Sequence, residues 1–120
     1  MATESVVRVR RVYEDAAPDD GTRVLVDRIW PRGLRRADAR LDVWCKEVAP
    51  STELRKWYAH DPERFEEFKR LYRVELTEPE RATALACLRA LLEQSTLTLL
   101  TATKRVEISG AWVLATLLRS

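Results

Sequence analysis

The alternation of apolar and polar positions predicts four strands along the chain. Val6 to Tyr13 alternates between apolar and charged residues, as a half-exposed strand does. Arg23 to Ile29 holds three consecutive apolar residues, which indicates a strand buried on both faces. Apolar runs predict a third strand from Val43 to Val48 and a last one from Thr96 to Thr101.

Apolar residues at helical spacing fill most of the chain between the third and the last strand. Ser51 is placed to cap a helix that starts near Thr52, and Asp61-Pro62 restarts the helix as an N-cap followed by a proline. Another helix begins at Pro79, and a closing helix surrounds Val113 to Leu118. The apolar side of the middle helix consists of Phe65, Phe68, Tyr72 and Leu76.

Strands that alternate with helices predict a single α/β domain over residues 1–120, with a small mixed or largely parallel sheet of about four strands flanked by helices. A chain of 120 residues has the length of one ordinary domain. The link between the first two strands has only about nine residues, which is short for a helical crossover. These strands are therefore either a long-looped antiparallel hairpin or a parallel pair that is not simply wound, and we favour a mixed sheet.

Composition supports a folded core and limits the classes of function. With 46% hydrophobic and 33% charged residues, the chain is not intrinsically disordered. Twenty-one basic residues against nineteen acidic ones leave a net charge of +2, too small to favour nucleic-acid binding. No apolar stretch is long enough to span a membrane and the first residues lack a signal pattern, so we expect a cytoplasmic protein.

The two cysteines, Cys45 and Cys87, are too few for a disulfide scaffold and cannot ligate a metal alone. The simplest interpretation is that both are small buried hydrophobic residues. A nucleophilic Cys45 is the alternative, but the adjacent Lys46 would point to the opposite face of a strand. No zinc-ligand, phosphate-loop or dinucleotide-binding spacing occurs, so no metal and no cofactor are expected.

The segment from Asp27 to Arg36 carries the clearest chemical signal. It holds four arginines and no acid after Asp27, and it follows the most buried-looking strand. Open α/β sheets bind ligands at the carboxyl ends of their strands, and guanidinium groups bind phosphates or carboxylates through paired hydrogen bonds. We therefore predict a site for a small anionic or phosphorylated ligand, in which Gly33 lets the ligand approach the backbone. The candidate ligand-binding residues are Arg28, Trp30, Arg32, Gly33, Ser51, Arg55 and Lys104.

Asp27 and His60 are candidates for separate roles. Asp27 is expected to form a structural ion pair with Arg28 or Arg55, because a buried carboxylate must be compensated. His60, the only histidine, is either the acid–base catalyst or a histidine that complements a helix end. The alternative to the anion site is a solvated basic loop, its arginines paired with nearby acids: Asp38, Asp42 or Glu47.

The motif Val-Asp-Arg-x-Trp-Pro-Arg-Gly at residues 26–33 resembles the YeaO-like branch of the bacterial domain-of-unknown-function family 488. Ala49-Pro50-Ser51, Leu54-Arg55-Lys56-Trp57 and His60-Asp61-Pro62 follow in the order and spacing of that family, so the likeness covers nearly the whole chain. The resemblance implies a small cytoplasmic bacterial α/β protein without a settled activity. Some members carry a MarR-type transcriptional-regulator label, but this sequence shows no winged helix-turn-helix pattern.

One departure from the family pattern lies just before the last helix. Members usually open this helix with a His-Asn turn, which Ile108-Ser109-Gly110 replaces here. If that histidine serves chemistry in relatives, this chain lacks it and either only binds its ligand or relies on His60. Ser109 can still cap the closing helix.

Three functions compete. The first is an enzyme or a binding protein with an arginine-lined pocket for a small anion, and the residues leave open which of the two. The second is a nucleic-acid-binding or transcription-associated protein that stacks bases on Trp30 or Trp57, and the third is a scaffold or oligomerisation module. Exposure of the tryptophan rings separates the first two, because stacking requires an open ring. We rank the anion pocket first and expect weak or no nucleic-acid binding and no membrane association.

Overall fold

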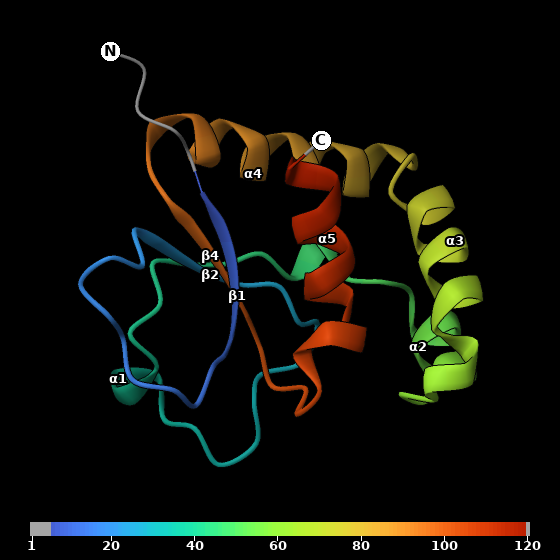
Figure 1. Ribbon diagram of the computed structural model, residues 1–120, viewed down its shortest axis with the longest axis horizontal. Coiled ribbons are helices and arrows are strands. Elements are labelled where there is room, and N and C mark those ends of the chain that lie inside the picture. Colours follow the sequence, from blue (N-terminus) through green and yellow to red (C-terminus); the bar gives the residue numbers. More distant parts are fainter. Residues whose placement is uncertain (1–5, 120) are drawn as a thin grey trace.

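Strand β4 (Leu97–Thr101) lies inside the sheet, and all of its residues are buried. The structure, a computed structural model, describes residues 6–119. β4 pairs with β1 (Val7–Arg11) on one side and with β2 (Thr22–Leu25) on the other, while β3 (Val43–Trp44) extends the outer edge of β2. Every pairing is parallel, and the strand order is β1-β4-β2-β3 (Figure 1).

The predicted α/β class is confirmed, but the favoured mixed arrangement is wrong because the sheet is wholly parallel. β1 and β2 are parallel strands that do not touch, since β4 lies between them. Residues 12–21 join them without a helix. An extended link of this length reaches about 33 Å, and a strand as short as β1 measures about 17 Å. The link therefore returns to the start of the sheet without a crossover helix.

Four helices cover one face of the sheet, and α4 lies across the end at which the strands begin (Figure 1). The opposite face is covered by the 12–21 link and by the segment between β2 and β3, which includes the short helix α1 (Arg36–Ala39). None of the helices in the described part of the chain is long and apolar enough to cross a membrane. The covering helices are α2 (Thr52–Tyr58), α3 (Phe65–Glu75), α4 (Pro79–Gln94) and α5 (Gly110–Arg119).

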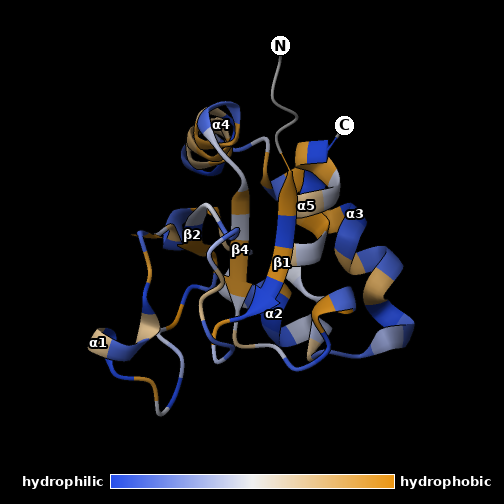
Figure 2. Cartoon of the chain, turned by 60° about the vertical axis from the view of Figure 1, so that its left-hand side comes forward, coloured by the Kyte–Doolittle hydropathy of each residue, from blue (hydrophilic) through white to orange (hydrophobic). Residues whose placement is uncertain are grey.

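Successive side chains of the inner strands point to opposite faces of the sheet, which divides the core into two clusters. Val24 and Leu99 face the helices, whereas Leu25 and Leu100 face the opposite side, where Trp30 packs against them. The edge strand β1 is only half-buried beyond its first residue, as its pattern predicts, and Figure 2 shows hydrophobic and hydrophilic residues alternating along it. The sheet is therefore buried on both faces at its centre and partly exposed at its β1 edge.

The predicted strand from Val43 to Val48 is wrong beyond its first two residues. β3 ends at Trp44, and a 3₁₀ helix follows at Lys46–Val48. The Cys45 N–H still donates to the carbonyl of Leu25, the last residue of β2, at 2.8 Å. The chain then turns and buries Val48 completely in the core.

The predicted helix starts are confirmed by their caps. The Ser51 hydroxyl accepts the Leu54 N–H, and the Asp61 carboxylate accepts the Glu63 N–H before Pro62 opens the next turn. These polar side chains satisfy amides that have no partner inside the helix.

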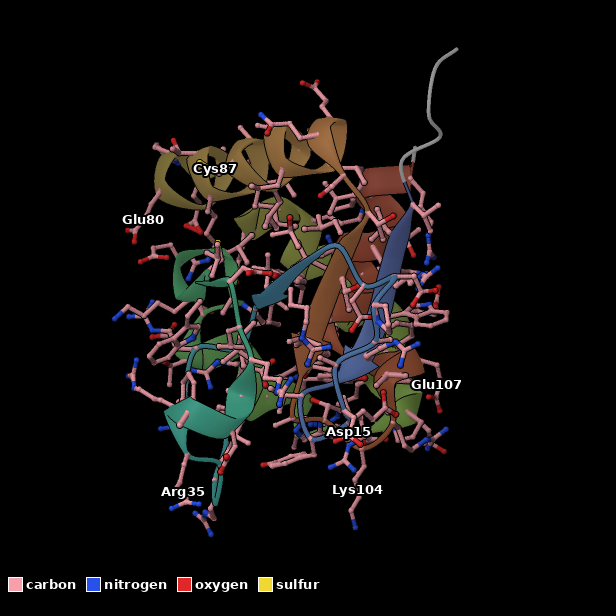
Figure 3. All side chains as sticks on the ribbon, turned by 90° about the vertical axis from the view of Figure 1, so that its left-hand side faces the viewer. Asp15, Arg35, Glu80, Cys87, Lys104 and Glu107 are labelled. Atoms are coloured by element: carbon pink, nitrogen blue, oxygen red, sulfur yellow. The ribbon has the colours of Figure 1, made fainter. Side chains whose placement is uncertain are left out.

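The two cysteines differ in exposure. Cys45 is buried as expected, but Cys87 is exposed, so that part of the expectation is wrong. Only Ala84 and Leu88 of α4 are fully buried, and they lie one turn apart. Cys87 is rotated by about 100° from Leu88 around the helix, which turns it away from this narrow contact (Figure 3).

We expect one fast and one slow thiol in the native protein. Cys87 should react with a bulky disulfide reagent, whereas burial raises the pKa of Cys45 to about 11 and leaves it as an inert thiol. Spectrophotometric thiol titration before and after denaturation checks this. Cys87→Ser should remove the fast phase, and a fast phase that persists in this variant would contradict the assignment.

Two glycines with positive φ offer a matched test of backbone packing. A Cβ on Gly21 (φ +63°) would lie 2.1 Å from the Thr96 carbonyl oxygen, whereas a Cβ on Gly33 (φ +78°) would meet no atom within 4 Å. We expect Gly33→Ala to cost about 1 kcal/mol through φ alone, and Gly21→Ala to cost more than about 3 kcal/mol. Urea unfolding of both variants measures this difference, and equal losses would refute it.

Candidate functional site

The carboxyl ends of β2 and β4 open into a cleft of about 810 Å³. Its walls come from five segments that are distant in sequence: the loop after β2, α2 with the residues on either side of it, α3, the end of β4 with the residues after it, and the start of α5. Parallel strands bring their carboxyl ends to one edge, so the cleft lies where open α/β sheets bind ligands. Its polar lining residues include Asp27, Arg28, Arg32, Arg55, Lys56, His60, Thr101, Thr103 and Ser109.

The structure brings together most of the predicted site and leaves three residues outside it. Arg28, Trp30, Arg32 and Arg55 line the cleft, as do Asp27 and His60. Their role in binding stays a prediction. The three that do not line the cleft are Gly33, Ser51 and Lys104.

Each of these three residues has another environment. Ser51 is held by the α3 residue Glu75, whose carboxylate accepts both the Ser51 backbone N–H at 2.8 Å and the Ser51 hydroxyl. Gly33 occupies an open turn. Lys104 extends from the loop after β4 into solvent (Figure 3). Ser51 is therefore a structural tether between α2 and α3.

The Asp27 carboxylate is held by neutral donors. It accepts the Thr101 hydroxyl and the Ala102 N–H, each at 2.8 Å. Within residues 6–119 it forms no ion pair, so the expected pairing with Arg28 or Arg55 is not what holds it. Burial raises the pKa of the Asp27 carboxyl. The hydrogen bonds from Ala102 and Thr101 lower this pKa, as do the nearby positive charges of His60 and Arg55, but they offset the rise only in part.

Arg28 and Arg32 are exposed, so the alternative of a solvated basic loop stays open. Arg35 pairs with Asp38, but Arg28 and Arg32 make no side-chain hydrogen bond or ion pair within residues 6–119. Arg55 donates to the Pro50 carbonyl at 3.3 Å and to the Thr52 hydroxyl at 3.1 Å, which fixes the guanidinium at the cleft wall. Two guanidinium groups are thus unpaired beside a third that is fixed in place.

The tryptophans differ in exposure, which bears on the stacking hypothesis. Trp30 is half-buried, donates its Nε1–H to the Leu34 carbonyl at 2.7 Å, and packs edge-on against Trp44 at 5.3 Å. The guanidinium of Arg36 lies 4.7 Å from the Trp30 ring centroid. Trp30 is therefore a supported wall, whereas Trp57 on α2 is 40% exposed and is open to a partner.

Ser109 and His60 do not form a nucleophile–base pair in the described part of the chain. The Ser109 hydroxyl accepts the Trp112 N–H at 3.2 Å and donates to the Val106 carbonyl at 2.7 Å, which confirms its predicted role as the cap of α5. His60 is exposed, follows α2 with φ +57°, and makes no hydrogen bond within residues 6–119. Within the same residues, no group of three or more His, Cys, Asp or Glu side chains could hold a metal ion.

Sequence reasoning missed the cleft residues Lys56, Thr101 and Thr103. Lys56 follows Arg55 on the helix whose start the Ser51 cap predicts, so its place next to Arg55 could have been read from the sequence. Thr101 closes the last predicted strand, so a parallel sheet order alone would have put it beside Asp27.

Comparisons with known proteins agree on one family. The family model DUF488-N3i, described as the inactive DUF488-N3 subclade, matches residues 6–120. The chain is 58% identical over 118 residues to the uncharacterized protein Rv3073c of Mycobacterium tuberculosis, an alignment that covers 98% of each chain. It is 40% identical over 114 residues to the uncharacterized protein YeaO of Escherichia coli, covering 95% of this chain and 97% of that one. No solved structure matches.

The raised pKa of Asp27 gives a testable pH dependence. As the pH rises above about 4, the unfolded chain loses this proton before the folded one, so ionisation favours unfolding until the folded-state pKa is passed. We therefore expect wild-type stability to fall relative to Asp27→Asn over this range, since asparagine keeps the shape, can accept the Ala102 N–H on Oδ1, and can donate from its amide to the Thr101 hydroxyl. Urea unfolding at successive pH values measures it. Asp15→Asn, at an exposed site, is the control, and parallel curves for wild type and Asp27→Asn would contradict the claim.

Proposed function

Because the chain belongs to the DUF488 family, in the subclade described as inactive, we propose that it binds a small anionic ligand at the carboxyl edge of its sheet without converting it. The resemblance seen in residues 26–33 is confirmed by the family match and by the identity to YeaO. The family carries no named ligand, so the ligand class is inferred from the chemistry of the cleft.

The observation that carries the proposal is the unbalanced charge of the cleft. Arg28, Arg32, Arg55 and Lys56 line it, against the single carboxylate of Asp27. The two unpaired guanidinium groups are available for paired hydrogen bonds to phosphate or carboxylate. A concave wall of one charge sign also concentrates anions from solution.

Binding without turnover follows from how the remaining polar groups are used. A general base must lie within hydrogen-bond distance of the proton that it removes and is usually oriented by a second group. The Ser109 hydroxyl is engaged in capping α5, and His60 makes no hydrogen bond within residues 6–119 that would orient its ring, which lies 6.1 Å from the Tyr58 ring. Ile108-Ser109-Gly110 also stands where the family resemblance implies a His-Asn turn.

Nucleic-acid binding remains the second candidate because of one surface feature. The exposed ring of Trp57 lies beside Lys56, and the guanidinium of Arg64 is 5.4 Å from its centroid. A net charge of +2 supplies few phosphate contacts, so such binding should be weak and lost at physiological salt. Binding of a polynucleotide that persists at about 150 mM salt would favour this candidate instead.

Removing either free arginine should weaken anion binding without unfolding the protein. We expect Arg28→Ala and Arg32→Ala to bind ribose 5-phosphate and inorganic phosphate about 10- to 100-fold less tightly than wild type, the loss expected for charged hydrogen bonds. Isothermal titration calorimetry measures the affinities, and circular dichroism checks the fold.

Arg89→Ala is the matched control, because Arg89 is exposed on α4 and lies outside the cleft. Its affinities should equal those of wild type. The proposal fails if neither anion binds the wild-type protein, or if all three variants lose affinity equally.

A further inference from the structure

We propose that the anion is one end of a ligand with a planar aromatic ring, the chemical class represented by the mononucleotides. This inference rests on the proposed anion site and adds what the rest of the ligand must be. It follows from the size of the cleft, the character of its walls, and the two unlike polar ends that it presents.

The cleft is larger than a bare anion needs. Its volume of about 810 Å³ lies within the range of sites for small organic molecules, which is roughly 300–1,000 Å³. A phosphate or sulfate held by Arg28 and Arg32 would leave most of this space to water. The space therefore fits a ligand with an organic body attached to its anionic group.

The residues that line the cleft beyond the arginines include aromatic rings at its base and apolar side chains at its rim. Tyr58 stacks on Phe68 with ring centroids 4.1 Å apart, and its hydroxyl is already bound to the Ile108 carbonyl at 2.6 Å. The Tyr72 hydroxyl is likewise bound to the Val48 carbonyl. These aromatic residues are almost fully buried, so they form the base of the cleft, and the hydroxyls of Tyr58 and Tyr72 are already engaged.

Ile29 extends this apolar surface to the rim. It is 68% exposed, the highest value for a large apolar side chain in residues 6–119, and it lies between Arg28 and Trp30 on the cleft wall. An isoleucine this exposed is unfavourable in the free protein, because its apolar surface contacts water. A planar ring that lies against Ile29 and the neighbouring indole would cover this surface.

Asp27 determines which end of the ligand can reach the end of β2. Its carboxylate accepts two hydrogen bonds, although a carboxylate has room for about four. A phosphate is repelled by this group, so the anionic end must lie at Arg28 and Arg32. The end that meets Asp27 must donate a hydrogen bond, as ring N–H and amino groups do. Such a ligand carries an anion, a flat ring and a donor edge, which is the chemistry of a nucleotide.

Calorimetric titration of the full chain tests the proposal with matched probes. These are the four common ribonucleoside 5′-monophosphates, their nucleosides, ribose 5-phosphate and inorganic phosphate. We expect at least one nucleotide to bind at least about tenfold more tightly than ribose 5-phosphate, because ring stacking adds to the phosphate contacts. Ile29→Ser should reduce this advantage about three- to tenfold while leaving the affinity for ribose 5-phosphate unchanged.

Val74→Ser is the control, since Val74 is also an exposed apolar residue (58%) but lies on α3 outside the cleft. If no nucleotide binds more tightly than ribose 5-phosphate, the aromatic-ring proposal is overturned while the anion site stands. If neither ribose 5-phosphate nor any nucleotide binds, the anion site is wrong as well.

Discussion

The position of β4 between β1 and β2 is the constraint on which the rest of the molecule depends. Leu97 pairs with both Val7 and Thr22, so residues from the beginning and end of the chain must meet before the sheet exists. The Thr96 carbonyl accepts the Thr22 N–H at 2.9 Å, with Gly21 packed directly against it. The same strand carries the donors that hold Asp27, so its insertion assembles the core and the floor of the cleft in one step.

The two acids that flank β2 are compensated in different ways, and the difference leaves the cleft its charge. Asp20 and Arg23 form a buried ion pair at the start of β2. Asp27, beyond the other end, is held by the Thr101 hydroxyl and the Ala102 amide. Because these donors are neutral, neither Arg28 nor Arg55 is neutralised by ion pairing with Asp27. A buried carboxylate satisfied by arginines would have removed the positive charge on which the proposed anion binding depends.

The pattern of apolar and polar residues predicted the features that depend on interactions between residues close together in sequence. Helix starts at Ser51 and Asp61 depend on short-range capping, and the arginine-rich segment after Asp27 marked the edge of the sheet at which the cleft opens. The partners of Asp27 lie 74 and 75 residues away along the chain, so only the strand order reveals them. Other misses have similar causes. Ser51 suits an anion site chemically but is bound by Glu75, and the exposure of Cys87 depends on how α4 is rotated against the core.

The residues that shape the cleft also hold the fold together. Tyr58 ties α2 to the turn before α5 through the Ile108 carbonyl, and Ser109 caps α5 within that same turn. Neither contact requires an ionisable side chain at the turn, so Ile108-Ser109-Gly110 maintains this geometry without one. The unpaired guanidinium groups of Arg28 and Arg32 stabilise nothing in the described fold. Such exposed and unpaired groups fit the anion binding that we propose.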